Sequence, residues 1–200
     1  MSKIILDLYG GTGSWSKPYK DAGYDVRVFT KPDHDIHYLG LENMIDLKNE
    51  QVYGILAAPP CTMFSLARTT AKTPRDLKQA MEAVEDTLRI VWEARHHNKL
   101  AFWALENPKA LLRQFLGKPP FSFDASEFGE KYNKATDIWG YFNSPKKQEY
   151  THHGEATRSN ARVLPAIPGD YKLDPDMTKR QIQRSITPEG FAQAFFRANQ

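Results

Sequence analysis

The chain of 200 residues contains a single cysteine, Cys61. One cysteine excludes an internal disulfide and a cysteine-based zinc site, and it fits a reducing compartment. The sequence also lacks any apolar run near the roughly 20 residues that a membrane-spanning helix needs. We therefore expect a cytoplasmic protein with no membrane partner and no metal.

The chain has little excess charge, since 27 Lys and Arg stand against 24 Asp and Glu, a net charge of +3. So mild an imbalance does not by itself indicate a nucleic-acid partner. The excess lies within residues 145–200, where nine basic residues face six acidic ones. This pattern fits either a solvated tail or a surface that contacts phosphates.

What the chain does have is enough apolar and aromatic sequence, 40% and 12%, for one folded domain over residues 1–200. Strand and helix patterns alternate along its first two-thirds, which predicts a mostly parallel sheet with helices on both faces. The predicted strands lie at 3–9, 25–29, 52–57 and 101–105. The predicted helices span 14–22 and a longer stretch through Trp92 that Thr73 caps, with Pro74 in its first turn.

The last third of the sequence changes character. Residues 121–128 and 136–142 are predicted to form strands of a hairpin or an antiparallel edge. The polar, proline-rich stretch 144–184 is too long for an ordinary connection, so it is either a wrapping functional loop or a partly mobile one. A final helix is predicted to start at Thr187-Pro188-Glu189 and to bury Phe191, Ala194 and Phe195.

A glycine-rich turn, Asp7 to Ser16, follows the first predicted strand. Glycines let the backbone turn sharply and approach a ligand closely. The spacing matches neither the dinucleotide pattern nor the phosphate-binding loop. It suits instead the amino-acid and ribose ends of S-adenosylmethionine; a purely structural turn is the alternative.

Two further motifs stand at the carboxyl ends of predicted strands. Pro59 and Pro60 end one strand and leave the Cys61 thiol at its carboxyl end, where open α/β sheets bind ligands. Glu106-Asn107-Pro108 ends the next strand. Taken alone, the Pro-Cys pair could occur by chance, and Glu-Asn-Pro also fits a turn that starts a helix. Together they place a thiol and a carboxylate on the same rim as the glycine turn.

These motifs resemble, in order, those of the cytosine-C5 DNA methyltransferases, particularly the short forms found in phages. The matching segments are 7–16 for the cofactor, 59–65 for the nucleophile, 106–108 for the acid and 184–192 for the closing motif. The resemblance implies a Rossmann-like class I methyltransferase fold dependent on S-adenosylmethionine, with 144–184 as a reduced recognition segment. It also implies the cytoplasm of a bacterium or phage-infected cell.

The resemblance implies a role for each matched residue. Cys61 would attack C6 of a cytosine flipped out of DNA, and Glu106 would protonate or hydrogen-bond N3. The substrate-binding residues would be Pro60, Ser65, Asn107, Pro108, Lys134 and Thr136. The residues that hold S-adenosylmethionine would be Asp7, Leu8, Tyr9, Gly10, Gly11, Thr12, Gly13, Ser14, Trp15, Thr30, Asp35, Ile36 and Pro59.

The chain departs from the family pattern at three places, the most important being that 144–184 leaves little room for a target-recognition domain. The acidic residue that usually holds the ribose is missing, because Thr30-Lys31-Pro32 follows the second strand; Asp33 or Asp35 is the candidate substitute, and Asp35-Ile36 resembles the pair that faces adenine. The family's Gln-x-Arg-x-Arg segment, whose arginine normally contacts the base, is also absent. Within 128–139, Lys134 and Thr136 either contact the base in its place or belong to a surface strand pair.

The resulting expectation is methyl transfer from S-adenosylmethionine to C5 of cytosine in DNA, with low or short sequence specificity. Two alternatives stay open. The acceptor is RNA or a free cytosine nucleotide, or the chain is a catalytically silent nucleic-acid-binding module that keeps the fold.

Overall fold

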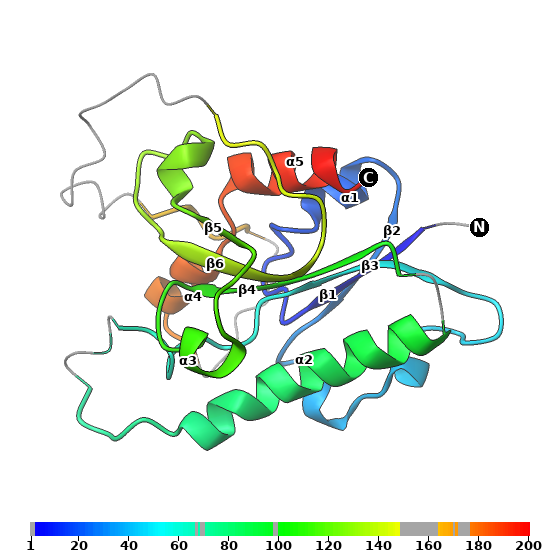
Figure 1. Ribbon diagram of the computed structural model, residues 1–200, viewed down its shortest axis with the longest axis horizontal. Helices are drawn as coiled ribbons and strands as arrows, with labels where there is room; N and C mark the ends of the chain where they lie inside the picture. Colours follow the sequence, from blue (N-terminus) through cyan, green and yellow to red (C-terminus); the bar gives the residue numbers. More distant parts are fainter. Residues whose placement is uncertain are drawn as a thin grey trace.

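A six-stranded sheet forms the centre of the computed structural model (Figure 1). The structure describes residues 3–66, 68, 71–97, 100–148, 164–169, 171 and 177–200. Much of the predicted loop-rich segment 144–184 therefore lies outside the described residues. No helix within the described ranges is long and apolar enough to cross a membrane.

The sheet is mostly parallel. Its strands are β1 (Ile4–Leu8), β2 (Asp25–Phe29), β3 (Val52–Ala57), β4 (Phe102–Pro108), β5 (Phe121–Phe123) and β6 (Thr136–Tyr141). They lie in the order β2-β1-β3-β4-β6-β5, in which the first four are parallel and β6 runs antiparallel to both its neighbours. The predicted Rossmann-like α/β fold is thereby confirmed, as is the antiparallel hairpin of its last two strands.

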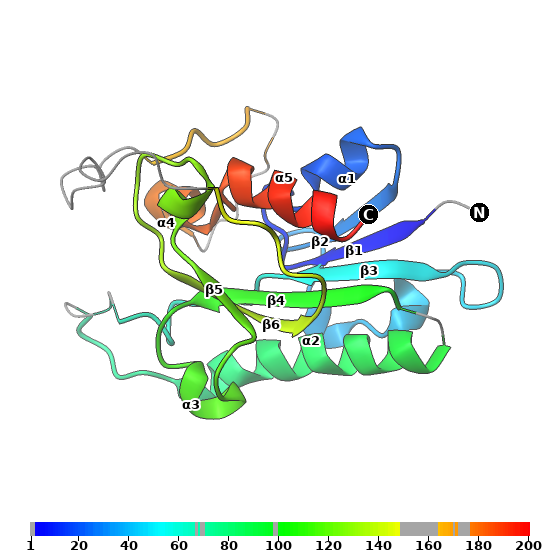
Figure 2. The same ribbon diagram turned by 45° about the horizontal axis from the view of Figure 1, so that its top comes forward.

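Helices cover both faces of this sheet (Figure 2). The helices are α1 (Lys17–Asp21), α2 (Leu77–His97), α3 (Arg113–Leu116), α4 (Lys179–Ser185) and α5 (Glu189–Ala198), with short 3-10 helices η1 (Ile36–Tyr38), η2 (Leu41–Asn43) and η3 (Ala125–Phe128). Because side chains alternate along a strand, Leu6 packs toward α2 while the adjacent Ile5 packs toward α1 and α5. Because β1, β3 and β4 are parallel, their carboxyl ends lie together at one edge of the sheet, between the two helical layers.

Helix α5 buries an aromatic face against the sheet. Phe191 stacks on Phe123 with ring centroids 4.1 Å apart, and Phe195 meets Trp15 edge to face at 5.4 Å. The sequence-based prediction for this helix is confirmed, since it starts at Glu189 and buries Phe191, Ala194 and Phe195.

The predicted start of the long helix is wrong. Helix α2 begins at Leu77, because the Asp76 carboxylate accepts the backbone N–H of Gln79 at 2.9 Å and so caps the helix. The Thr73 hydroxyl, expected to be the cap, instead accepts a hydrogen bond from the Arg68 guanidinium at 2.6 Å.

Three other predicted boundaries also differ. Strand β4 does not end at 105 but continues through Pro108, because β6 pairs alongside it up to Thr136. The helix predicted over 14–22 spans only Lys17–Asp21. The strand predicted over 121–128 stops at Phe123, where the Asp124 side chain caps η3.

Gly190 supplies a test of the packing between α5 and η3. A β-carbon at Gly190 would lie 1.9 Å from the Phe128 carbonyl oxygen, whereas one at Gly169 would have no atom within 4 Å. We expect Gly190→Ala to lower the free energy of unfolding by about 1–3 kcal/mol through overpacking. Gly169→Ala is the matched control and should leave it nearly unchanged. Equal denaturation midpoints for the two variants would contradict this close approach.

Candidate active site

The glycine-rich turn after β1 has a backbone that most residues avoid. Gly11 and Gly13 have φ of 54° and 67°, and Tyr9 has φ of 55°, which is uncommon for a residue other than glycine. The turn closes through a hydrogen bond from the Gly13 N–H to the Gly10 carbonyl at 2.9 Å. Backbone rather than side chains therefore faces the adjoining space.

Asp7 lies buried beneath this turn. A β-carbon at Gly10 would be 2.4 Å from the Asp7 carboxyl carbon, so the turn passes directly over the carboxyl group. Oxygen Oδ2 accepts the Ser16 hydroxyl at 2.5 Å, while Oδ1 has no hydrogen-bond partner among the described residues. Burial raises the pKa of Asp7 to about 7, and the Ser16 hydrogen bond opposes this only in part. Near neutral pH the group gains or loses a proton easily.

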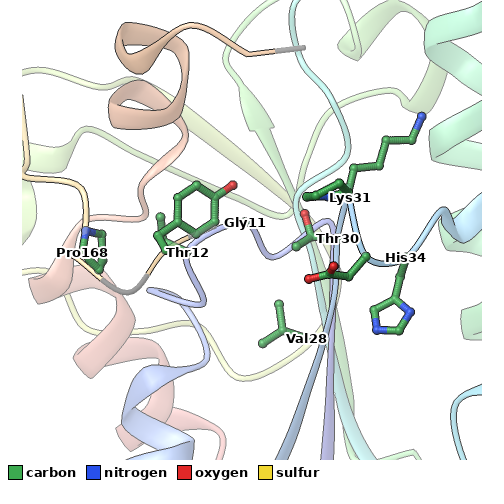
Figure 3. A pocket seen from close by; sticks show the side chains of 10 residues that line it. Gly11, Thr12, Val28, Thr30, Lys31, His34 and Pro168 are labelled. Carbon is green, nitrogen blue, oxygen red and sulfur yellow. The ribbon is translucent and has the colours of Figure 1, made fainter. Parts of the chain in front are cut away.

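A cavity of about 260 Å³ adjoins the turn (Figure 3). Thr12 and Pro168 lie on one side of it, Thr30 and Lys31 on the other, and Val28 between them. The Lys31 side chain extends away from the cavity in this view, and its amine pairs with the Asp35 carboxylate at 3.1 Å.

Of the two carboxylates considered as ribose ligands, Asp33 lines the cavity. Asp35 is paired with Lys31 and also accepts the backbone N–H of His37 at 3.3 Å, which starts η1. Ile36, in the same turn, is buried in the hydrophobic core beneath α2. The geometry therefore favours Asp33 as the substitute.

Three of the predicted cofactor residues lie in different surroundings, two of them buried and one hydrogen-bonded to the C-terminal segment. Leu8 is fully buried in the core under α2, and Trp15 is buried against Phe191 of α5. Ser14 accepts the backbone N–H of Thr187 at 3.0 Å. The segment that resembles the closing motif thus returns to the glycine turn.

The cavity also has a wall that the sequence did not reveal. Pro168 and Tyr171 line it, although the whole stretch 144–184 was interpreted as a replacement for a recognition segment. No periodic pattern or motif there signals a contact with the glycine turn, because the two segments meet only in the folded chain.

The backbone after β3 presents Cys61 at the sheet edge. The Ala58 N–H donates to the Leu8 carbonyl at 2.9 Å, which continues the β1–β3 pairing by one step. Pro59 is buried, and its carbonyl accepts the Asn107 side-chain amide at 3.1 Å. Cys61 follows as a half-buried free thiol. This hydrogen bond joins the thiol-bearing turn to β4.

Glu106 and Lys134 meet beside this turn. The Glu106 side chain is almost buried, and its Oε1 lies 3.4 Å from the Lys134 amine. The same amine donates to the Ile186 carbonyl at 3.2 Å. Lys134 therefore connects the acid on β4 to the C-terminal segment.

These charges act on the Cys61 thiol. Burial raises its pKa most strongly, and the Glu106 carboxylate raises it further, whereas the Lys134 and Arg184 cations lower it. The structure therefore brings Cys61, Glu106 and Lys134 together. Sequence reasoning missed Arg184, whose only signal was its position at the start of the segment resembling a closing motif.

The remaining predicted substrate residues surround this group less closely. Pro60 is exposed, Pro108 is half-buried at the end of β4, and Ser65 lies four residues beyond the thiol. Thr136 is fully buried, and its hydroxyl donates to the Lys134 carbonyl at 3.2 Å. In the part of the chain that the structure describes, no group of three His, Cys, Asp or Glu side chains is placed to hold a metal ion.

Comparisons with known proteins add little to this geometry. No protein-family model and no curated protein matches the chain. A solved structure of Spodoptera frugiperda DNMT2 carrying three substitutions is similar to it at a TM-score of 0.44 and 17% identity, over 78% of this chain and 54% of that one. The S. pombe Dnmt2 methyltransferase is similar at 0.42 and 14%, over 86% and 58%. The chain spans little more than half the length of each of these structures.

The opposing effects of Glu106 and Lys134 on the thiol are testable without a substrate. Glu106→Gln removes a negative charge, so the pKa of Cys61 should fall and its alkylation by iodoacetamide should extend to lower pH. Lys134→Met removes a positive charge and should shift the profile to higher pH. Alkylation rates followed by mass spectrometry across pH measure both shifts.

As a control, the wild type and the two variants are alkylated after unfolding in denaturant, where all three should show the same dependence of rate on pH. Shifts of the same sign in the two variants would contradict the arrangement of charges around Cys61.

Proposed function

We propose that the protein transfers a methyl group from S-adenosylmethionine to C5 of cytosine in DNA, through a covalent bond between Cys61 and C6 and with low or short sequence specificity. The observation that carries the proposal is the placement of the Cys61 thiol, under the electrostatic influence of Glu106, at the sheet edge that also holds Asp7 and its glycine turn. The strand order and the ordered motifs agree with it.

The residues around the glycine turn fit S-adenosylmethionine. A buried carboxylate oxygen suits the ammonium of its amino-acid part, and Asp7 offers Oδ1, which has no hydrogen-bond partner among the residues that the structure describes. Gly11 and Gly13 would let the backbone pass close to the donor, and Asp33 and Thr30 would meet the ribose hydroxyls. Asp35 would lie near the adenine, whereas Ile36, which the resemblance also assigns to the adenine, is buried in the core beneath α2 and does not face the cavity. When bound, the donor supplies a methyl group activated by a sulfonium.

Cys61 and Glu106 would make the cytosine ring reactive. The Cys61 thiolate gives its electron pair to C6, and the ring electrons move toward N3, where the Glu106 carboxyl group delivers a proton. C5 then carries enough electron density to accept the methyl group. Loss of the C5 proton to solvent restores the C5–C6 double bond and expels the Cys61 thiolate, while N3 returns its proton to Glu106.

Lys134 would hold the acid in place during these steps. Its amine is positioned between Glu106 Oε1 and the Ile186 carbonyl, and its charge lowers the pKa of Cys61. A cation here stabilises the thiolate before addition and the Glu106 carboxylate after proton transfer.

The proposal is tested by incubating the protein with labelled S-adenosylmethionine and mixed-sequence duplex DNA, RNA or dCMP in parallel. We expect 5-methylcytosine in the DNA, measured by nucleoside mass spectrometry. Cys61→Ser should lower the rate at least about 10²-fold, because a serine hydroxyl stays un-ionised near neutral pH.

Near-ultraviolet circular dichroism and donor binding of Cys61→Ser serve as controls for folding. Label only in RNA or dCMP would identify a different acceptor. Undiminished methylation by Cys61→Ser would reject the covalent mechanism. Nucleic-acid binding without turnover on any acceptor would indicate a silent binding module.

Donor binding should depend on pH through Asp7. Because burial raises its pKa to about 7, a cation that needs the carboxylate must displace a proton below that pH. Affinity for S-adenosylhomocysteine should therefore increase from about pH 6 to about pH 8, by up to about tenfold per pH unit below the pKa. Isothermal titration calorimetry measures this, together with the proton released.

The matched ligand is 5′-methylthioadenosine, which lacks the amino-acid part and should bind with no such dependence. Asp7→Asn should also remove the pH dependence of S-adenosylhomocysteine binding. Identical pH profiles for the two ligands would show that Asp7 does not meet the ammonium.

A further inference from the structure

The turn from Cys61 to Ser65, called the nucleophile turn here, is held by hydrogen bonds at almost every carbonyl. The Cys61 carbonyl accepts the backbone N–H groups of Phe64 and Ser65 at 3.0 and 2.9 Å. The Phe64 carbonyl accepts the Leu111 N–H at 3.2 Å, and the Phe64 ring is fully buried. The turn is therefore fixed by its own backbone, by the segment after β4 and by the buried Phe64 ring.

Arg75, from the segment directly before α2, also holds this turn. Its guanidinium donates to the Met63 carbonyl and, at 3.0 Å, to the Ser65 carbonyl. Arg75 stands directly before Asp76, which caps α2. Helix α2 is anchored by buried residues such as Val84 and Ile90. Arg75 thus connects the nucleophile turn to a rigid element of the fold.

We propose that Arg75 is a positioning residue that fixes the nucleophile turn and so aligns the Cys61 thiol for attack. The planar guanidinium donates to two carbonyl oxygens at once in a fixed geometry. A lysine amine, a point charge on a flexible stem, does not fix the two oxygens relative to each other in this way. The cations that lower the pKa of Cys61 are Lys134 and Arg184. Arg75 therefore acts through the geometry of the backbone.

The loop contains a natural comparison residue. Arg68 belongs to the same connection between β3 and α2, and its guanidinium also makes two hydrogen bonds, to the Thr73 carbonyl at 2.9 Å and to the Thr73 hydroxyl at 2.6 Å. These bonds lie within the loop and do not reach the nucleophile turn. Arg68→Gln therefore removes the same charge and a similar fork while leaving the turn intact.

The experiment compares Arg75→Gln, Arg75→Lys and Arg68→Gln with the wild type, without donor or acceptor. In Arg75→Gln, amide hydrogen exchange in a peptide covering 61–66 should accelerate at least about tenfold, because the Met63 carbonyl loses its guanidinium partner, the Ser65 carbonyl keeps only the Arg68 backbone N–H at 3.4 Å, and the turn that protects the Phe64 and Ser65 amides loosens. The pH midpoint of Cys61 alkylation should stay in place. Arg75→Lys should restore the charge without restoring the protection, and Arg68→Gln should match the wild type.

The role in methyl transfer rests on the proposed function and has its own readout. Arg75→Gln should lower kcat at least about tenfold with an unchanged KM for the donor, since a small misplacement of the nucleophile is costly. Full protection or full kcat in Arg75→Lys would show that charge suffices and would overturn the proposal. An unchanged exchange rate in Arg75→Gln, or a shift of its pH midpoint for Cys61 alkylation, would also overturn it.

The two proposals fail in different ways. If the exchange pattern is as expected but no protein methylates any acceptor, the proposed function is wrong and the anchoring of the turn is unaffected. If the wild type methylates DNA and Arg75→Gln does so at the same kcat, the positioning role is wrong and the proposed function stands.

Discussion

One buried hydrogen bond ties the turn that carries Cys61 to the strand that carries Glu106. The Asn107 amide donates to the Pro59 carbonyl at 3.1 Å, with both residues buried. Cys61 follows Pro59 by two residues and Glu106 directly precedes Asn107, so this bond links the backbone of the thiol to the backbone of the acid. Losing it would leave buried polar groups unpaired, which costs about 1–3 kcal/mol for each group. The parallel pairing of β3 with β4 places the two segments at one edge, and this bond joins them just beyond the last paired residues, Ala57 and Leu105.

The C-terminal segment connects the glycine turn with the Glu106–Lys134 pair beside Cys61. The Ile186 carbonyl accepts the Lys134 amine, and the next residue, Thr187, donates its backbone N–H to Ser14. Two adjacent residues thus contact the acid–lysine pair on one side and the glycine turn on the other. Helix α5 follows at once and holds this junction through Phe191 and its aromatic neighbours. The site therefore depends on packing that begins about 180 residues after the first strand.

Much of the fold was predictable where the hydrophobic pattern alone decides the structure. The strands at 25–29 and 52–57 have the predicted bounds, since short apolar or alternating runs between turn residues leave little choice. The boundaries that were wrong depended on which of several available partners each residue takes. Pro108 belongs to β4 because β6 pairs with it, and α2 starts at Leu77 because Asp76 outcompetes Thr73 as its cap. The pairing with β6 is not visible in a local pattern, whereas the cap is a choice between two nearby residues that the local sequence leaves open.

The sequence by itself determined the α/β alternation and the placement of Asp7, Cys61 and Glu106 at the carboxyl ends of their strands, because local periodicity and proline chemistry act over a few residues. Only the tertiary structure decided which charges surround the thiol and what holds its turn. Lys134, Arg184 and Arg75 come from three separate segments, and their contacts form only when the sheet and its helices pack. Electrostatic and hydrogen-bond partners depend on distance in space, which sequence separation does not encode.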